Sequence, residues 1–129
     1  MKSNNSSKYL YAAAALVVIL LIGFIATKEK APSIYDGFAQ CLTEKGAQMY
    51  GAWWCPHCEN QKKSFGNSFD YIKYTECSVP GSRAMNETCK EAGIEGYPTW
   101  VFEDDSRLSG ERSMEELSEK TGCELPSKE

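Results

Sequence analysis

The chain has 129 residues, enough for one small domain and a short additional segment. It contains six cysteines but one histidine, and its net charge is −4 at pH 7. All 18 acidic residues and 12 of the 14 basic residues lie after residue 27, so that part carries a net charge of −6 (12 against 18) without any basic run. These features argue against a nucleic-acid partner, because phosphate recognition uses clustered Lys and Arg.

An unbroken apolar run, Tyr9–Ala26, contains no charge and no proline. At about 1.5 Å per residue it approaches the roughly 30 Å thickness of a bilayer core. A cleaved signal peptide has a shorter apolar core and a small-residue cleavage site, and Phe24-Ile25-Ala26 is a weak one. We therefore predict an uncleaved membrane anchor at residues 9–27, after a cytoplasmic tail at residues 1–8, with a cleaved signal peptide as the alternative.

The cysteine content indicates the compartment of the remaining chain. Six cysteines in a small domain indicate an oxidising environment, because cytosolic chains seldom keep so many thiols without a metal. We therefore expect residues 28–32 to be a linker, residues 33–125 an extracytoplasmic domain and residues 126–129 a tail. A bacterial periplasm or a cell surface fits this expectation.

The first part of the domain contains a predicted helix and a strand. Apolar residues at helical spacing follow Ser33, and the pattern ends at Gly46, a residue that often stops a helix. The apolar run Ala47–Ala52 then predicts a strand. This strand leads directly into the two closely spaced cysteines of the chain.

Cys55 and Cys58 are separated by two residues, so a helix that begins at the first would bring both sulfurs within bonding distance. At a helix N-terminus, unpaired N–H groups and the helix dipole favour an anion. We therefore expect Cys55 to be the thiolate and Cys58 the buried resolving thiol. Pro56 suits a first helical turn, and His57 can donate to the Cys55 sulfur or place charge beside it.

Each of these effects stabilises the reduced pair, and a disulfide whose reduced form is stabilised is an oxidant. The motif thus favours formation of disulfides in other proteins. A zinc half-site is an alternative, but Cys77 and Cys89 are not a second close pair and the histidine lies inside the motif, so we expect no metal. A purely structural disulfide is another alternative, although so short a loop constrains the unfolded chain little.

A second strand and another helix are predicted after the helix that ends near Phe65. Phe69–Cys77 alternates apolar and polar residues, which indicates a strand. It would run parallel to the first strand because a helix connects them, in a right-handed crossover. A loop and a short helix, Ala84–Ala92, follow.

The last part of the domain predicts a hairpin and a helix. Pro98 stands at a strand entrance, where proline does not interrupt a ladder. Glu103–Ser106 indicates a hairpin turn before an edge strand at Arg107–Ser109. A capping box then opens a final helix, Ser113–Lys120. The predicted class is therefore α/β: a βαβ unit, a helical crossover, a β-hairpin and a C-terminal helix, preceded by a transmembrane helix.

This order of elements is that of a thioredoxin-like fold. Trp54–Cys58 and Gly96–Thr99 resemble the thioredoxin superfamily, in which a cis-proline loop faces the active disulfide, and the Cys-Pro-His-Cys form is similar to DsbA-type disulfide oxidases. A closer resemblance covers Phe38–Cys123, to the thioredoxin-like domain fused to bacterial and plant homologues of vitamin K epoxide reductase (VKOR). It rests on Cys41–Ala47, Met49–Ala52, Trp54–Cys58, Tyr74–Cys77, Gly93–Trp100 and Gly122-Cys123.

The resemblance implies roles for individual residues. Cys55 would be the nucleophile, Cys58 the resolving cysteine and His57 the tuning residue. Pro98 would be the cis-proline, and backbone groups of its two neighbours would bind an extended client segment by strand addition. The implied substrate-binding residues are Trp54, Pro56, Tyr97, Pro98 and Thr99.

The four remaining cysteines permit three pairings. The resemblance supports Cys77–Cys89 as a structural disulfide. Cys41 and Cys123 would then tie the first helix to the C-terminus. The alternative is that one of these pairs is a second redox relay.

In the VKOR fusions the thioredoxin-like domain collects electrons from substrate thiols, and the membrane reductase domain passes them to a quinone. This chain departs from them in having a single anchor in place of that multi-helix domain. The resemblance therefore implies no cofactor of its own, client proteins with free thiols, and a separate VKOR-like or DsbB-like quinone-linked membrane partner. A thiol reductase or disulfide isomerase, and a membrane-tethered peptide-binding chaperone, are the alternatives.

Overall fold

A computed structural model describes residues 5–26 and 31–127 of the chain. These residues form two compact units, which divide between Ala31 and Pro32. Parts of the predicted N-terminal tail, anchor end, linker and C-terminal tail fall on residues 1–4, 27–30 and 128–129, which lie outside the described residues.

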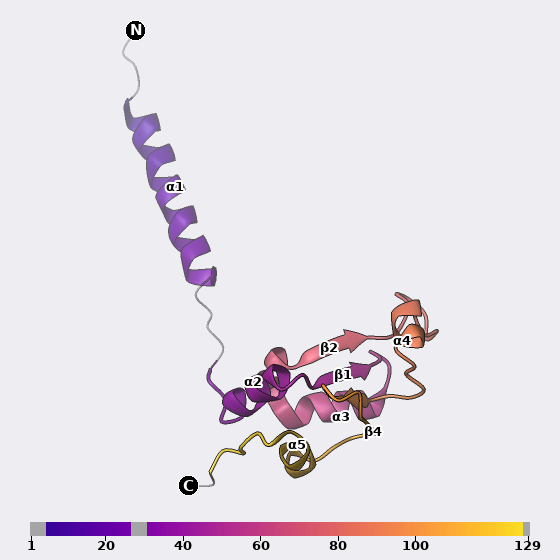
Figure 1. Cartoon of the computed structure of the whole chain (residues 1–129). Coiled ribbons are helices and arrows are strands. Elements are labelled where there is room, and N and C mark those ends of the chain that lie inside the picture. Colours follow the sequence, from indigo (N-terminus) through magenta and orange to yellow (C-terminus); the bar gives the residue numbers. More distant parts are fainter. Residues whose placement is uncertain (1–4, 27–30, 128–129) are drawn as a thin grey trace. The chain divides into compact units, whose positions relative to one another are not determined.

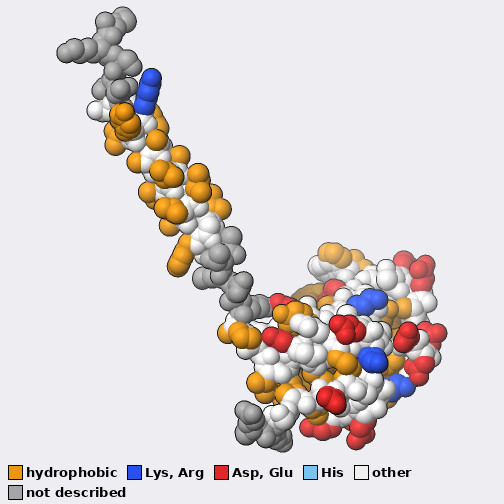
Figure 2. Space-filling model, turned by 60° about the vertical axis from the view of Figure 1, so that its left-hand side comes forward, with side chains coloured by type: hydrophobic (Ala, Val, Ile, Leu, Met, Phe, Trp, Pro, Cys, Tyr) orange, Lys and Arg blue, Asp and Glu red, His pale blue; other side chains and the backbone are white. Residues whose placement is uncertain are grey.

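The first unit contains the helix α1 (Asn5–Ala26), which begins inside the predicted polar tail. Its segment Ser6–Phe24 is long and apolar enough to cross a membrane. Figure 2 shows hydrophobic side chains along the visible length of this helix. A cleaved signal sequence has the same features.

The second unit is built on a four-stranded mixed sheet in the order β2-β1-β3-β4 (Figure 1). β1 (Gln48–Gly51) pairs in parallel with β2 (Lys73–Glu76) and antiparallel with β3 (Thr99–Val101), which pairs antiparallel with β4 (Arg107–Ser109). The helix α3 (Pro56–Phe65) is the crossover between the two parallel strands. This arrangement fits the thioredoxin-like fold expected from the sequence.

One apolar core joins the central strands to three helices. Trp100 of β3 and Phe65 of α3 are almost fully buried, and their ring centroids lie 6.1 Å apart. Phe65 also stacks on Phe38 of α2 (Asp36–Glu44), and Leu117 of α5 (Met114–Thr121) belongs to the same buried cluster. Burial of side chains of this size stabilises the fold by about 1.5–3 kcal/mol each, which holds β1 and α3 in fixed relation.

The structure corrects the predicted second strand. Gly66–Tyr71 is a 3₁₀ helix, η1, and only the later residues of the predicted strand form β2. Gly66 ends α3 with φ of +56°, a conformation that favours glycine. The buried Ser68 donates its hydroxyl to Asp36 at 2.7 Å, which connects η1 to α2. This contact between distant segments overrides the alternating pattern.

The helix predicted at Ala84–Ala92 is also shorter in the structure. α4 covers Glu87–Glu91, and Asn86 caps it by accepting a hydrogen bond from the Cys89 amide at 3.0 Å. Figure 1 shows α4 beyond the end of β2. By contrast, the capping box at Ser113 is present as predicted.

Two disulfides join distant parts of the domain. Cys41 is bonded to Cys123, and Cys77 is bonded to Cys89. The first connects α2 to the C-terminal segment, and the second connects the end of β2 to α4. Cys55 and Cys58 are free thiols.

The two disulfides close loops of very different length, with sequence separations of 82 and 12 residues. A chain-entropy model gives about 4.5 kcal/mol for the longer loop and about 3 kcal/mol for the shorter one. We expect Cys41→Ala/Cys123→Ala to lower the free energy of unfolding of residues 32–129 more than Cys77→Ala/Cys89→Ala does. Urea unfolding measures both losses, and a larger loss from the shorter loop would contradict this expectation.

Candidate active site

Cys55 is the N-cap residue of α3. Its backbone is extended, with φ of −85° and ψ of 116°, and its Sγ accepts a hydrogen bond from the Cys58 backbone N–H at 3.4 Å. Pro56 occupies the first turn, where its missing N–H costs nothing. The helix therefore directs a backbone donor and the positive end of its dipole at the Cys55 sulfur, an arrangement that stabilises a thiolate.

Cys58 lies one turn further along and is only 1% exposed, against 6% for Cys55. Burial raises the pKa of the Cys58 thiol to about 12, and the neighbouring Cys55 adds to this shift. The Lys62 ammonium, which lies 4.1 Å from the centroid of the Tyr74 ring, partly opposes it. At neutral pH, Cys58 therefore stays a protonated thiol.

Gly51, near the end of β1, gives Cys58 the space to approach the sheet. A Cβ at this position would lie 2.9 Å from Cys58 Sγ and 3.0 Å from Cε2 of Tyr74. Both separations are shorter than van der Waals contact. The absence of a side chain at residue 51 is thus a requirement for the position of the resolving thiol.

Glu76 connects the end of β2 to the loop before Cys55. Its carboxylate accepts hydrogen bonds from the Trp53 amide (3.1 Å), the Ser78 amide (2.9 Å) and the Tyr74 hydroxyl (2.7 Å). Burial alone would raise the pKa of Glu76, but these hydrogen bonds lower it below its ordinary value. Burial and the same carboxylate hold the pKa of Tyr74 well above its usual range. Glu76 therefore stays ionised and fixes the chain leading into the cysteine motif.

The loop before β3 brings a second segment to Cys55. The Tyr97–Pro98 peptide bond is cis, and the Tyr97 carbonyl oxygen lies 3.7 Å from Cys55 Sγ, which donates to it. The Tyr97 ring also packs edge-on against Trp54, with centroids 5.8 Å apart. The Arg83 guanidinium lies 5.5 Å from the centroid of the same Trp54 ring. The loop before β3 therefore contacts Cys55 through the Tyr97 carbonyl and the neighbouring Trp54 through the Tyr97 ring.

The predicted substrate-binding residues differ in how they could contact a client. Pro56 is exposed and Trp54 and Tyr97 are half-buried, whereas Pro98 and Thr99 are buried. Thr99 pairs with β1 on one side and with β4 on the other, and its hydroxyl donates to the Gly96 carbonyl at 2.8 Å. The backbone of Thr99 is therefore already paired on both sides within the sheet. Tyr97 is the better candidate for backbone hydrogen bonds to a client.

His57 has a different partner from the one expected. Its ring Nδ1 donates to Glu111 Oε1 at 2.6 Å, and Asn60 Nδ2 donates to the same oxygen at 3.2 Å. In the described part of the chain, no hydrogen bond joins the ring to the Cys55 sulfur. The hydrogen bond from His57 lowers the pKa of the Glu111 carboxyl below its usual value, and the one from Asn60 adds to this.

Sequence reasoning missed both Glu111 and Gln61. Gln61 is 2% exposed, and it lies three residues after Cys58 and four before Phe65. That spacing could have identified it as a residue of the buried helix face. Glu111 follows His57 by 54 residues, and no local pattern indicates their contact.

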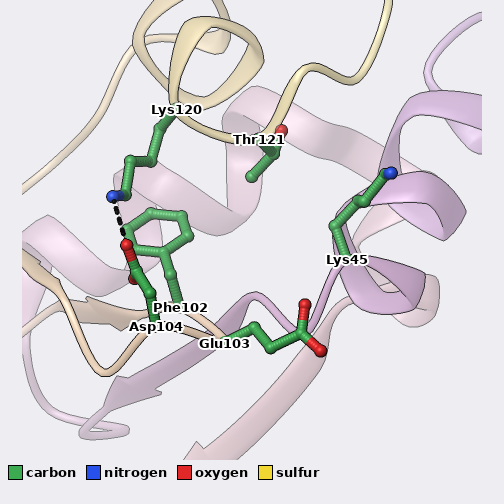
Figure 3. A pocket seen from close by; sticks show the side chains of 6 residues that line it. All are labelled: Lys45, Phe102, Glu103, Asp104, Lys120 and Thr121. Atoms are coloured by element: carbon green, nitrogen blue, oxygen red, sulfur yellow. Dashed lines mark hydrogen bonds and ion pairs between the residues drawn. The ribbon is translucent and has the colours of Figure 1, made fainter.

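A separate pocket has no lining residue from the segment that contains Cys55 and Cys58. Its volume is about 420 Å³, and an ion pair between Lys120 and Asp104 at 3.1 Å lies at its edge (Figure 3). Its lining consists of Lys45, Phe102, Glu103, Asp104, Lys120 and Thr121. No residue of Trp54–Cys58 lines it, and no group of three or more His, Cys, Asp or Glu within residues 5–26 and 31–127 could hold a metal. The free thiols of the described chain, Cys55 and Cys58, lie instead at the start of α3.

Comparison with known proteins adds one strong similarity, although no family model matches the chain. The chain is 43% identical over 91 residues to the thiol-disulfide oxidoreductase LTO1 of Arabidopsis thaliana. The match covers 67% of this chain and 24% of that relative, so the chain spans about a quarter of the relative's length. A match that covers 67% of a chain of 129 residues spans positions 55 and 58 wherever it begins. It therefore includes Cys55 and Cys58. This similarity supports a thiol-disulfide oxidoreductase domain.

The contact between Gly51 and Cys58 can be tested by adding one methyl group. We expect Gly51→Ala to lower the free energy of unfolding by about 1–3 kcal/mol, because the new Cβ overpacks against Cys58 Sγ. Gly37→Ala in α2 is the matched control, since nothing lies within 4 Å of its added Cβ and a helical Gly→Ala change stabilises by up to about 1 kcal/mol. Urea unfolding measures the stability of both variants, with Cys55 and Cys58 reduced and the other two disulfides intact. Equal stability of the two variants would contradict this account.

Proposed function

We propose that this chain is a protein disulfide oxidase in which Cys55 and Cys58 form the redox pair. The observation that carries the proposal is the position of Cys55 as the N-cap of α3, with the Cys58 amide directed at its sulfur at 3.4 Å. The similarity to a named thiol-disulfide oxidoreductase supports the reaction class. The helix start stabilises the reduced form, which favours transfer of the disulfide to a client.

In the proposed reaction, a client thiolate attacks Sγ of Cys55 in the oxidised pair. The bond between Cys55 and Cys58 breaks, a client–Cys55 disulfide forms, and Cys58 leaves as a thiolate that takes up a proton because its pKa is about 12. A second client thiolate then attacks the client sulfur of the mixed disulfide, and Cys55 leaves as a thiolate. The client loses two electrons, and the pair gains them as a dithiol.

The Tyr97 carbonyl lies beside the reactive sulfur and is a contact for the client. It accepts the Cys55 S–H at 3.7 Å while that thiol is protonated. In the thiolate and in the disulfide that donor is absent, so the carbonyl can accept a client N–H by strand addition. Trp54 and Pro56 supply the adjacent apolar surface for the same segment.

We further propose that α1 anchors the protein in a membrane with the domain on the extracytoplasmic side, in a bacterial periplasm or at a cell surface. The length and apolar composition of α1 support an anchor. The two disulfides of the domain support an oxidising compartment. Because the reduced pair must be recharged, a VKOR-like or DsbB-like quinone-linked protein in the same membrane is the proposed electron acceptor.

The oxidase mechanism predicts a trapped intermediate. In a Cys58→Ser variant the Cys55 thiolate can still attack a client disulfide, which is the reverse of the second step, and release one client sulfur as a thiolate. No Cys58 thiol is present to displace the client from Cys55, so mixed disulfides through Cys55 are expected to accumulate. They should appear on non-reducing gels and disappear on reduction, while oxidation of a dithiol peptide falls to background. Cys55→Ser is the control and is expected to form no such species.

Two results would change the proposal. Failure of Cys58→Ser to trap any client would contradict the mechanism, and full function of a Cys55→Ser/Cys58→Ser variant would favour a peptide-binding chaperone. Trapped clients together with a pair found largely reduced in the cell would indicate a reductase or isomerase instead.

A further inference from the structure

Two side chains on the first turns of α3 converge on one carboxylate oxygen. His57 Nδ1 lies 2.6 Å from Glu111 Oε1, and Asn60 Nδ2 lies 3.2 Å from the same atom. Glu111 comes from the segment between β4 and α5, and the side chains of His57 and Glu111 are 68% and 39% exposed. The redox helix and a distant segment thus meet two residues after Cys55.

The position of Glu111 is fixed by buried contacts next to it. The Arg112 amide donates to Gln61 Oε1 at 2.7 Å, and Gln61 Nε2 donates to the Arg112 carbonyl at 3.0 Å. Trp100 Nε1 also donates to Gln61 Oε1, at 3.3 Å, and both side chains are buried. The backbone N–H and C=O of Arg112 are therefore both bound to the buried Gln61. This fixes the chain next to Glu111, so the fold directs the Glu111 carboxylate toward His57.

We expect this contact to act on the orientation of the His57 ring. An exposed ion pair contributes little to stability. The Glu111 carboxylate, however, accepts the ring N–H and so keeps that donor from the Cys55 sulfur. Cys58, Tyr74 and Tyr97 interact electrostatically with Cys55, and Lys62 and Glu76 interact with these groups. None of these is a hydrogen-bond partner of Glu111 in the described residues.

We propose that Glu111 is a positioning residue that holds the His57 ring at the start of α3 and limits how strongly the Cys55–Cys58 pair oxidises thiols. The inference rests on the proposed redox function of the same pair. It goes beyond that function by assigning control of the oxidising strength to a segment outside the cysteine motif.

The sign of the effect follows from the hydrogen bond. Glu111→Gln replaces a charged acceptor with a neutral and weaker one, so the His57 ring N–H becomes free to donate to the Cys55 thiolate. That bond stabilises the reduced pair and makes the oxidised pair a stronger oxidant.

The experiment equilibrates the full chain in detergent micelles with glutathione buffers at neutral pH. For Glu111→Gln, we expect the equilibrium constant for glutathione oxidation to rise about three- to fivefold, or about 14–21 mV. Glu119→Gln, an exposed change of the same charge on α5, should leave this constant unchanged.

A His57→Ala background separates the positioning role from a direct effect of charge. There, the ratio of equilibrium constants with and without Glu111→Gln is expected to fall to about one, because no ring remains to be positioned. A ratio of one in the unaltered background, an equal rise in both backgrounds, or a rise that Glu119→Gln reproduces would overturn the inference while leaving the redox function intact. A wild-type pair that does not exchange with glutathione at all would overturn both.

Discussion

The hydrogen bond from the Cys58 amide to the Cys55 sulfur, at 3.4 Å, is the contact on which the rest of the site depends. It exists because β1 delivers the chain to the start of α3 with Cys55 in an extended conformation, before the helix turns inward. Glu76 holds the preceding loop through the Trp53 amide, and Gly51 leaves room below Cys58. These contacts lie on both sides of the cap and support the position of the sulfur.

The same helix end makes the two thiols chemically different. Cys55 receives a backbone donor and the positive end of the dipole, whereas Cys58 lies inside the fold and its burial raises the pKa of its thiol to about 12. In the proposed mechanism, Cys55 is therefore the leaving thiolate and Cys58 a protonated thiol. This asymmetry supports the roles of nucleophile and resolving thiol that we propose, and the contact between His57 and Glu111 joins the motif to a residue outside it.

Local patterns in the sequence predicted much of this site. The cysteine spacing, the strand before it and the capping box at Ser113 are short-range signals, and the structure contains each of them. The features that could not be predicted depend on contacts between distant segments. The 3₁₀ helix at Gly66–Tyr71 is connected to α2 through Ser68, and Glu111 reaches His57 across 54 residues. Alternation and helical spacing carry no information about such contacts until the fold brings the segments together.

The reduction potential of the Cys55–Cys58 pair, measured at neutral pH by equilibration of the wild-type protein with glutathione, tests the central claim most directly. An oxidase whose reduced form is stabilised by the start of α3 should lie within or above roughly −180 to −120 mV, the range from disulfide isomerase to DsbA. A value near the roughly −270 mV of thioredoxin would contradict the account, because such a pair gives electrons to client disulfides and requires an electron donor.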